Sequence, residues 1–233
     1  MDINKLCPGC MREVEDRDQT SFCPHCGYDF SNPKVSQHQL QPFTILKGKY
    51  VIGRVIGEGG FGITYLGYDL MLEIPVAIKE FYPNGFVTRE ANVTPQVTIF
   101  AGNNAADIEK WRNGFIKEAR SLAKFTNLEG IVKVQEFFNE NETAYIVMEY
   151  VDGITVKSYL KQNGGKLPVD QVLQMMKPVI QSLAKVHETG IIHRDISPDN
   201  IMITSSGGMK LLDFGAAKKR ISNVSAALFL KAL

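Results

Sequence analysis

The feature that most constrains this chain is a polar stretch, Ile192-His193-Arg194-Asp195-Ile196-Ser197-Pro198-Asp199-Asn200, followed by Asp213-Phe214-Gly215. Asp213 comes 18 positions after Asp195, and Asn200 comes five positions after it. Two carboxylates and an amide at these spacings suit a site for Mg²⁺ and phosphate. One carboxylate can accept or orient a proton, while the amide and the second carboxylate ligate the cation. Taken alone, His193-Arg194-Asp195 is equally compatible with an ordinary polar turn between two strands.

All four cysteines lie within the first 26 residues, as Cys7-Pro8-Gly9-Cys10 and Cys23-Pro24-His25-Cys26. Two C-x-x-C pairs separated by 12 residues suit tetrahedral coordination of Zn²⁺ by Cys7, Cys10, Cys23 and Cys26. Disulfides are the alternative, but the N-terminus lacks a secretory signal, and a redox pair would need only one C-x-x-C. The stretch resembles a zinc ribbon, in which the metal supplies most of the folding free energy. We expect His25 to be exposed.

Bulk composition describes a globular chain without general disorder, with 44% hydrophobic and 22% charged residues. The formal charge of +1 gives no electrostatic argument for nucleic acid, so a protein partner is weakly favoured for the ribbon. No apolar run approaches the roughly 20 residues that span a bilayer. The sequence therefore predicts a cytoplasmic chain, and leaves open a membrane anchor beyond residue 233.

A glycine-rich segment, Gly57-Glu58-Gly59-Gly60-Phe61-Gly62, stands between two predicted strands. The preceding stretch, residues 31–48, is polar and rich in Pro and Gln, which predicts a linker in which His38 is solvated. A dinucleotide-binding fold would place a helix after the glycines, whereas residues 63–68 have the character of a strand. A glycine-rich turn between strands can instead close its backbone amides over phosphates.

One lysine and one glutamate are predicted to pair within the first half of the chain. Lys79 ends the apolar run Ile74-Pro75-Val76-Ala77-Ile78, and a buried cation there needs an anion. Glu118 lies on the apolar face of a helix predicted over residues 107–126, which also carries Phe115 and Leu122. A solvated Lys79 at the end of a strand is the alternative.

Together these motifs resemble the protein kinase family, and Glu80-Phe81-Tyr82-Pro83 with an insertion over residues 81–104 resembles a bacterial Ser/Thr subgroup. The resemblance implies a two-lobed α+β fold: a five-stranded antiparallel sheet with one helix, then an incomplete helical lobe. Met148-Glu149-Tyr150-Val151 resembles the hinge that binds adenine. We therefore expect a zinc ribbon at 1–30, a linker at 31–48, an N-lobe at 49–152 and a partial C-lobe at 153–233.

The resemblance also implies residue roles. Catalytic roles fall on Asp195, Lys79, Glu118, Asn200 and Asp213, with Asn200 and Asp213 also holding Mg²⁺. Nucleotide binding falls on Gly57, Glu58, Gly59, Gly60, Phe61, Gly62, Thr64, Ala77, Lys79, Met148, Glu149, Val151 and Met202. Thr64 replaces the more usual Val and is β-branched like it. His193 is implied to be a scaffold residue.

Two departures qualify the resemblance. Ser197 stands where Ser/Thr kinases carry a Lys that offsets charge on the transferred phosphate, and its loss should slow transfer. Only 18 residues follow Gly215, so we expect a fragment or a truncated product. Ser222 and Ser225 are either phosphorylation sites that pair with Arg194 or ordinary loop serines.

The expected activity is transfer of the γ-phosphate of Mg·ATP to Ser or Thr of protein substrates. Two alternatives remain at this point. A pseudokinase that binds nucleotide and acts as a scaffold is favoured by Ser197 and the short C-terminal part. A small-molecule phosphotransferase on the same fold is disfavoured by Phe61 and the loop at Pro198.

Overall fold

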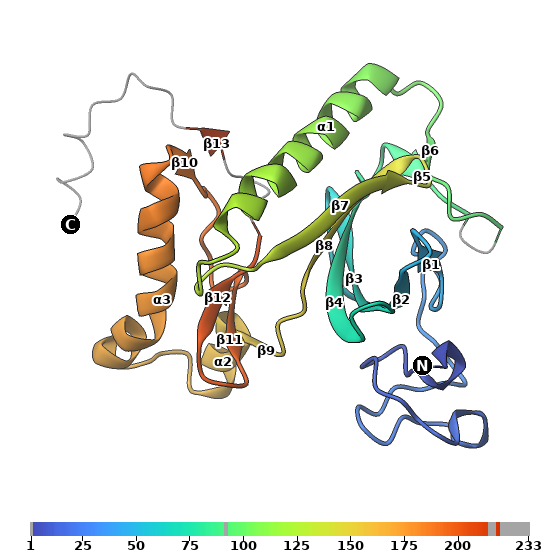
Figure 1. Cartoon of the computed structure of the whole chain (residues 1–233), viewed down its shortest axis with the longest axis horizontal. Helices are drawn as coiled ribbons and strands as arrows, with labels where there is room; N and C mark the ends of the chain where they lie inside the picture. The colour runs from blue at the N-terminus through green and yellow to red at the C-terminus, as the bar shows by residue number, and fades with distance from the viewer. Residues whose placement is uncertain (1, 91–92, 214–217, 220–233) are drawn as a thin grey trace. The chain divides into compact units, whose positions relative to one another are not determined.

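The computed structural model of the chain describes residues 2–90, 93–213 and 218–219. The chain forms two compact units. The first comprises residues 1–124 and 133–151, and the second comprises residues 125–132 and 152–233. Figure 1 shows the elements of each unit along the chain.

A six-stranded antiparallel sheet in the order β1-β2-β3-β4-β8-β7 forms the frame of the first unit. Its strands are β1 (Ile45–Leu46), β2 (Tyr50–Gly59), β3 (Gly62–Asp69), β4 (Ile74–Phe81), β7 (Val134–Glu140) and β8 (Thr143–Glu149). The β-branched and aromatic residues that predicted these strands fill the core, where Tyr50, Tyr65 and Tyr145 are almost fully buried.

The sheet has one strand more than the five that the sequence predicted, because β1 forms within the segment expected to be a linker. Leu46 is fully buried, and the chain reverses into β2 through Lys47 and Gly48, which both have positive φ. A two-residue strand has too little periodicity to be recognised in a sequence.

One long helix, α1 (Ala105–Leu122), packs against β7 and β8 of the same unit (Figure 1). Asn104 caps it by accepting a hydrogen bond from the Ala106 amide at 3.0 Å. Its buried residues include Phe115, Ala119 and Leu122, so the predicted apolar face is confirmed. A 3₁₀ turn, η3 (Ala123–Phe125), follows the helix.

The insertion between β4 and α1 contains a small hairpin of β5 (Val87–Thr88) and β6 (Thr98–Ile99). The N-terminal cysteine-containing segment carries two 3₁₀ turns, η1 (Ile3–Lys5) and η2 (Arg17–Gln19). It is packed against the sheet through a cluster of buried side chains: Leu6, Met11, Val51, Leu66 and Tyr68.

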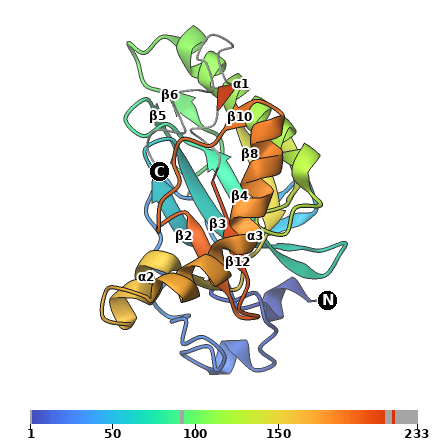
Figure 2. The ribbon, with the colours of Figure 1, turned by 90° about the vertical axis from the view of Figure 1, so that its left-hand side faces the viewer.

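The second unit combines two helices with short strands. Its elements are β9 (Gly153–Thr155), α2 (Val156–Gln162), α3 (Val169–Glu188), β10 (Ile191–Ile192), β11 (Ile201–Thr204), β12 (Met209–Leu211) and β13 (Lys218–Lys219). Strands β12, β11 and β9 form one antiparallel sheet, and β10 pairs with β13. Figure 2 shows α3 beside β12, which it contacts.

Helix α3 buries an apolar stripe only in its C-terminal half. Val179, Leu183 and Val186 are buried, whereas Val172 is exposed. The partners of α3 in this unit, β10 and β12, are short, so they cover only part of the helix. Pro178 lies within α3.

None of the helices in the described ranges combines the length and the apolar character that crossing a bilayer requires.

Candidate active site and metal centre

The polar loop between β10 and β11 brings Asp195 and Asn200 together. Asn200 donates from Nδ2 to Asp195 twice, to the carbonyl oxygen at 3.0 Å and to the carboxylate Oδ2 at 2.8 Å. The Asn200 amide also donates to the Ser197 carbonyl at 3.0 Å, which closes the loop between them. Because both bonds to Asp195 use Nδ2, the amide oxygen of Asn200 is left as the atom that could ligate a cation.

Asp213 reaches the same loop through the end of β12. The Leu212 amide donates to the Asn200 carbonyl at 2.8 Å, so the residue before Asp213 is hydrogen-bonded to Asn200. The three polar residues that the sequence selected, Asp195, Asn200 and Asp213, therefore belong to one small region of the second unit. Phe214, Gly215, Ser222 and Ser225 lie outside the described residues.

His193 supports the backbone of this loop. Its side chain is fully buried, and its Nδ1 accepts a hydrogen bond from the Asp195 amide at 3.2 Å. Burial lowers the pKa of His193, against the opposing effect of the nearby Asp213 and Asp195 charges. A neutral imidazole that accepts at Nδ1 carries its proton on Nε2. Arg194 has a φ of 70°, a left-handed conformation that is uncommon outside glycine and is found at functional loops.

The glycine-rich turn joins β2 to β3 in the first unit. Gly59 pairs with Gly62 at its tip, and Glu58 pairs with Ile63. A Cβ on Gly62 would lie 2.6 Å from the Glu80 carbonyl oxygen, so only glycine allows β3 to approach β4 there. The space beside Gly59 and Gly60 is open, since a Cβ on either residue would have no neighbour within 4 Å.

Lys79 lies on β4 directly opposite Thr64 of β3. It is half-buried, and its Nζ lies 6.0 Å from the centre of the Phe115 ring on α1. Glu118, three residues after Phe115, is half-buried on the same helix. Lys79 thus lies near the face of α1 that carries Phe115, and its pairing with Glu118 stays a prediction.

The residues expected around adenine lie on neighbouring strands. Ala77 of β4 pairs with Met148 of β8, and Val76 pairs with Glu149. Val151, two residues after β8, is buried. The remaining member of the set, Met202, belongs to the second unit, where it pairs with Thr155 and Lys210.

Comparison with known proteins decides the family, since the model of the protein kinase domain matches residues 50–230 of this chain. The chain belongs to the protein kinase family. The serine/threonine-protein kinase PrkC of Bacillus subtilis is 36% identical over 172 residues, and PknL of Mycobacterium tuberculosis H37Rv is 30% identical over 174. A solved structure, PpkA-294 in its apo form, superimposes with a TM-score of 0.70 at 34% identity, over 76% of this chain and 62% of that one.

These kinases are much longer than the part that this chain matches. The alignments cover 74% and 75% of this chain, but only 23% of PrkC and 38% of PknL. The kinase match begins at residue 50, so it does not include the cysteine-containing segment.

The four cysteine sulfurs converge on one point, and all lie within 4.8 Å of one another. Cys7 Sγ is 3.7 Å from Cys26 Sγ, and Cys10 Sγ is 3.9 Å from Cys23 Sγ. Tetrahedral zinc with Zn–S bonds of about 2.3 Å requires sulfurs roughly 3.8 Å apart. The four thiols therefore fit Zn²⁺, and the spacings are too long for disulfides.

The backbone of both cysteine pairs is folded toward this point. The Gly9 amide donates to Cys7 Sγ at 3.3 Å, and the Gly27 amide donates to the Cys23 carbonyl at 2.9 Å. Burial raises the pKa of the Cys7 thiol, and it raises the pKa of Cys10 to about 11. Burial alone would raise the pKa of the Cys23 thiol too, but hydrogen bonds from the His25 and Cys26 backbone outweigh it and lower this pKa instead. His25 is exposed, as predicted.

Sequence reasoning missed a buried ion pair directly beside Lys79. Glu80 is fully buried and accepts two hydrogen bonds from Arg89 of the insertion, one of them at 3.0 Å from Nη1 to Oε2. Tyr65 and Tyr145 also donate to the Glu80 carboxylate, at 3.0 and 2.8 Å. Glu80 shares the buried face of β4 with Ile78. The alternation of side chains along this strand could therefore have indicated that Glu80 is buried.

The Glu80 carboxylate changes the pKa values of the side chains that surround it. Burial alone would lower the pKa of the Arg89 guanidinium, but the Glu80 carboxylate raises it above the ordinary value for arginine. Burial, followed by the repulsion from Glu80, raises the pKa of both Tyr65 and Tyr145. The insertion of unknown role thus supplies the cation that allows Glu80 to be buried.

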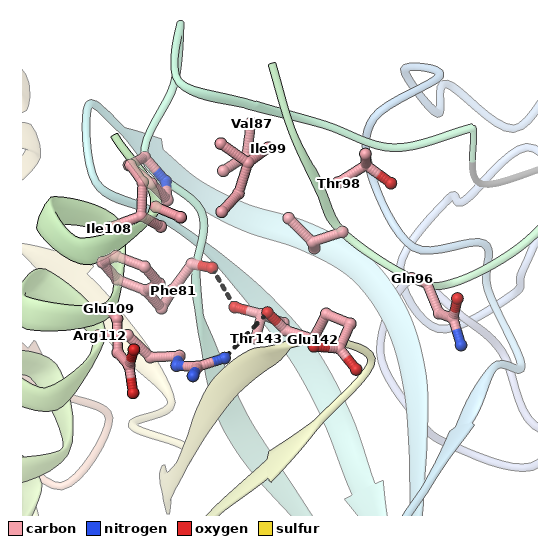
Figure 3. A pocket seen from close by; sticks show the side chains of 13 residues that line it. Phe81, Val87, Gln96, Thr98, Ile99, Ile108, Glu109, Arg112, Glu142 and Thr143 are labelled. Atoms are coloured by element: carbon pink, nitrogen blue, oxygen red, sulfur yellow. Dashed lines mark hydrogen bonds between the residues drawn. The ribbon is translucent and has the colours of Figure 1, made fainter. Parts of the chain in front are cut away.

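The insertion also covers a pocket of about 530 Å³ between its hairpin, α1 and the turn that joins β7 to β8. Figure 3 shows Thr143 donating to the Phe81 carbonyl and Arg112 reaching the Glu142 carbonyl at its edge. Val87, Ile99 and Ile108 line its apolar part.

Proposed function

We propose that the protein containing this chain is a serine/threonine kinase that transfers the γ-phosphate of Mg·ATP to Ser or Thr of protein substrates. The observation that carries the proposal is the closed loop in which Asn200 bonds Asp195 and Leu212 bonds Asn200, in a chain of the protein kinase family. The relatives PrkC and PknL are named as serine/threonine-protein kinases.

In this proposal each polar residue has one task. Asp195 orients the substrate hydroxyl and takes its proton as the oxygen forms a bond to the γ-phosphorus and the bond to the β–γ bridging oxygen breaks. The Asn200–Asp195 hydrogen bond at 2.8 Å fixes the direction of the Asp195 carboxylate. Lys79, assisted by Glu118, positions the α- and β-phosphates, and the backbone amides of the Gly57–Gly62 turn cover them.

The oxygens of Asn200 and Asp213 are the donors that Mg²⁺ prefers, so these two residues would hold it. When bound, Mg²⁺ offsets the negative charge of the phosphates. Ala77, Met148, Glu149, Val151 and Met202 would contact the adenine.

A nucleotide-binding scaffold without transfer activity is the second candidate, and Ser197 favours it. Its carbonyl accepts the Asn200 amide, so the backbone of the loop keeps its form with serine at this position. The serine side chain cannot supply the positive charge that a lysine would bring to the transferred phosphate. Binding of Mg·ATP without transfer would distinguish the scaffold.

We also propose that Cys7, Cys10, Cys23 and Cys26 hold one structural Zn²⁺. The sulfur spacings and the hydrogen bond from the Gly9 amide to Cys7 Sγ support this assignment. The metal would join two backbone turns that have only a small apolar core of their own, made by Val14, Tyr28 and Phe30 with the cysteines.

The test is transfer of labelled phosphate from Mg·ATP by the full-length protein, to itself and to a generic protein substrate. Asp195→Asn should lower the rate by about 10²- to 10⁴-fold, because it removes the group that takes the proton. Asp199→Asn is the matched control, since Asp199 lies in the same loop but pairs with Lys157 at 3.0 Å and is largely exposed.

Label on Ser or Thr that depends on Asp195 and not on Asp199 supports the kinase. Bound Mg·ATP with no Asp195-dependent label would overturn it in favour of the scaffold, and Ser197→Lys would then be expected to raise transfer.

A further inference from the structure

The cysteine-containing segment is attached to β2 immediately before the glycine-rich turn. The pairing of β2 with β3 is interrupted between Ile52 and Val55. There the Arg54 amide donates to the Pro8 carbonyl at 2.9 Å, and its Nε donates to the Gly9 carbonyl at 2.8 Å. The carbonyls of the first Cys-x-x-Cys turn thus accept hydrogen bonds from Arg54, at the place where β2 is not paired with β3.

Gly53 allows this close approach. A Cβ on Gly53 would overlap the Met11 Cε and would lie 2.5 Å from the Pro8 carbonyl oxygen. Leu6 and Met11 are buried against Val51 and Leu66 of the sheet. The cysteine-containing segment is therefore an integral part of the first unit.

The chain then reaches the glycine-rich turn through residues 36–40. The Gln39 amide donates to the Ser36 carbonyl at 3.0 Å, and Gln39 Oε1 accepts the Ser36 amide at 3.0 Å. Leu40 is buried, and its amide donates to the Tyr65 hydroxyl at 3.1 Å. This part of the expected linker is an ordered turn anchored in the core.

Two side chains of that turn hold Glu58. His38 Nε2 lies 2.8 Å from Glu58 Oε1, and Gln39 Nε2 donates to Glu58 Oε2 at 2.7 Å. His38, which was expected to be solvated, is only about one-third exposed. Burial alone would raise the pKa of Glu58, but the hydrogen bonds from Gln39 and His38 lower it, so its charged form is favoured.

The opposite side of the turn is held by backbone bonds from the insertion. The Asn84 amide donates to the Gly60 carbonyl at 2.9 Å, and the Tyr82 amide donates to the Phe61 carbonyl at 3.1 Å. The Phe61 ring meets the edge of Trp111 on α1, with ring centres 5.6 Å apart. With the insertion holding residues 60 and 61, the contacts of Glu58 determine the other half of the turn.

We propose that His38 and Gln39 are positioning residues for nucleotide binding, which hold the glycine-rich turn in place through Glu58. The inference rests on the proposed function, because it assumes that this turn covers the phosphates of ATP. A flexible glycine turn loses conformational entropy when it closes on a ligand, and a side chain that restrains it beforehand reduces that loss. Neither residue needs to touch the nucleotide.

An exchange of partners tests the contact. Gln39→Glu places a carboxylate against Glu58, and the repulsion should displace the turn. It should weaken Mg·ATP binding and raise the KM for ATP by about 3- to 10-fold, with a smaller effect on kcat, since one hydrogen bond to a charged group is lost. Adding Glu58→Gln restores an amide–carboxylate pair at the same place and should recover the KM. The carboxylate introduced by Gln39→Glu can still accept the Ser36 amide, so the local turn is preserved.

Gln37→Ala is the matched control, because Gln37 is exposed in the same segment. The assays use the full-length protein: equilibrium binding of Mg·ATP, then kcat and KM for phosphate transfer. A Gln39→Glu effect no larger than that of Gln37→Ala would overturn the proposal, as would a double variant that fails to recover.

The two failures are distinguishable. If Asp195-dependent transfer is absent, the proposed function fails, and the binding assay still measures the effect of Gln39 on the nucleotide. If transfer is present and Gln39→Glu changes neither binding nor KM, only the positioning role fails.

Discussion

Replacing Arg89 with methionine should destabilise the first unit more than any substitution of an exposed arginine. The residue is 3% exposed, and its side chain forms two hydrogen bonds with the fully buried Glu80. Its Nε also donates to the Pro95 carbonyl at 2.7 Å, and its Nη1 donates to the His38 carbonyl at 3.1 Å. Methionine fills a similar volume but supplies none of these donors.

The magnitude follows from the charge left behind. Removing one partner of a buried ion pair costs about 3–5 kcal/mol, because the other charge stays in the core without compensation. Tyr65 and Tyr145 still donate to Glu80, which places the expected loss near the lower end, at about 3 kcal/mol. With a urea m-value of roughly 2 kcal/mol/M, the unfolding midpoint should fall by about 1.5 M.

The single tryptophan makes the assay specific to this unit. Trp111 on α1 contacts Phe61 and Phe86 edge-on, with ring centres 5.6 and 5.0 Å apart, so its fluorescence reports on the insertion and the glycine-rich turn. Arg12→Met is the control, since Arg12 is exposed and should change the stability by less than about 0.5 kcal/mol.

A second substitution tests the physical reason. Adding Glu80→Gln to Arg89→Met removes the unpaired charge and should recover part of the loss. If Arg89→Met unfolds at the midpoint of the parent, or if the double variant is no more stable than Arg89→Met, the buried charge does not explain the stability.

Three further predictions concern the metal, a buried histidine and a helix cap. Strong chelators should release one Zn²⁺ per chain and lower the midpoint of thermal unfolding. Metal analysis and calorimetry measure the two effects. An unfolding midpoint that chelation leaves unchanged would contradict a structural metal. Burial lowers the pKa of His193, so the unfolded chain binds its proton first and stability should fall as the pH drops below about 6.5. His193→Gln should therefore lose less stability than the parent between pH 7.5 and 5.5, and equal losses in urea titrations would refute this. Thr155→Ala removes the bond to the Ser158 amide and should cost about 1 kcal/mol. Hydrogen exchange in α2 should then be faster, and unchanged exchange would show that the cap contributes nothing.

Periodic elements and spaced motifs were predictable because they depend on nearby residues. The stripe of Phe115, Ala119 and Leu122 predicted α1, and Asn104 starts that helix with a side-chain cap. The spacing of the four cysteines predicted that their sulfurs come together, and two short turns set that geometry. In each case the information lies within a few residues or in an uninterrupted pattern.

The unpredicted features depend on contacts between residues far apart in sequence. In the sequence, His38 and Gln39 resemble the ordinary polar residues of a linker. Their contact with Glu58, about 20 residues later, is seen only in the structure. Val172 fits the apolar period of α3, but its exposure depends on how far the short strands of that unit extend. Periodicity indicates which side of a helix is apolar, whereas burial also depends on the size of the partner.

One side chain, that of Arg89, connects the insertion to both the core and the N-terminal segment. Arg89 of the insertion neutralises Glu80 and also donates to the backbone carbonyl of His38, whose side chain contacts Glu58. The same arginine therefore serves the buried charge and the position of the turn at residues 36–40. Since Glu80 directly follows Lys79 on β4, the ion pair of Glu80 with Arg89 connects the insertion and the N-terminal segment to this strand. The hydrogen bonds that hold Arg89 in the core therefore also hold His38 near the glycine-rich turn.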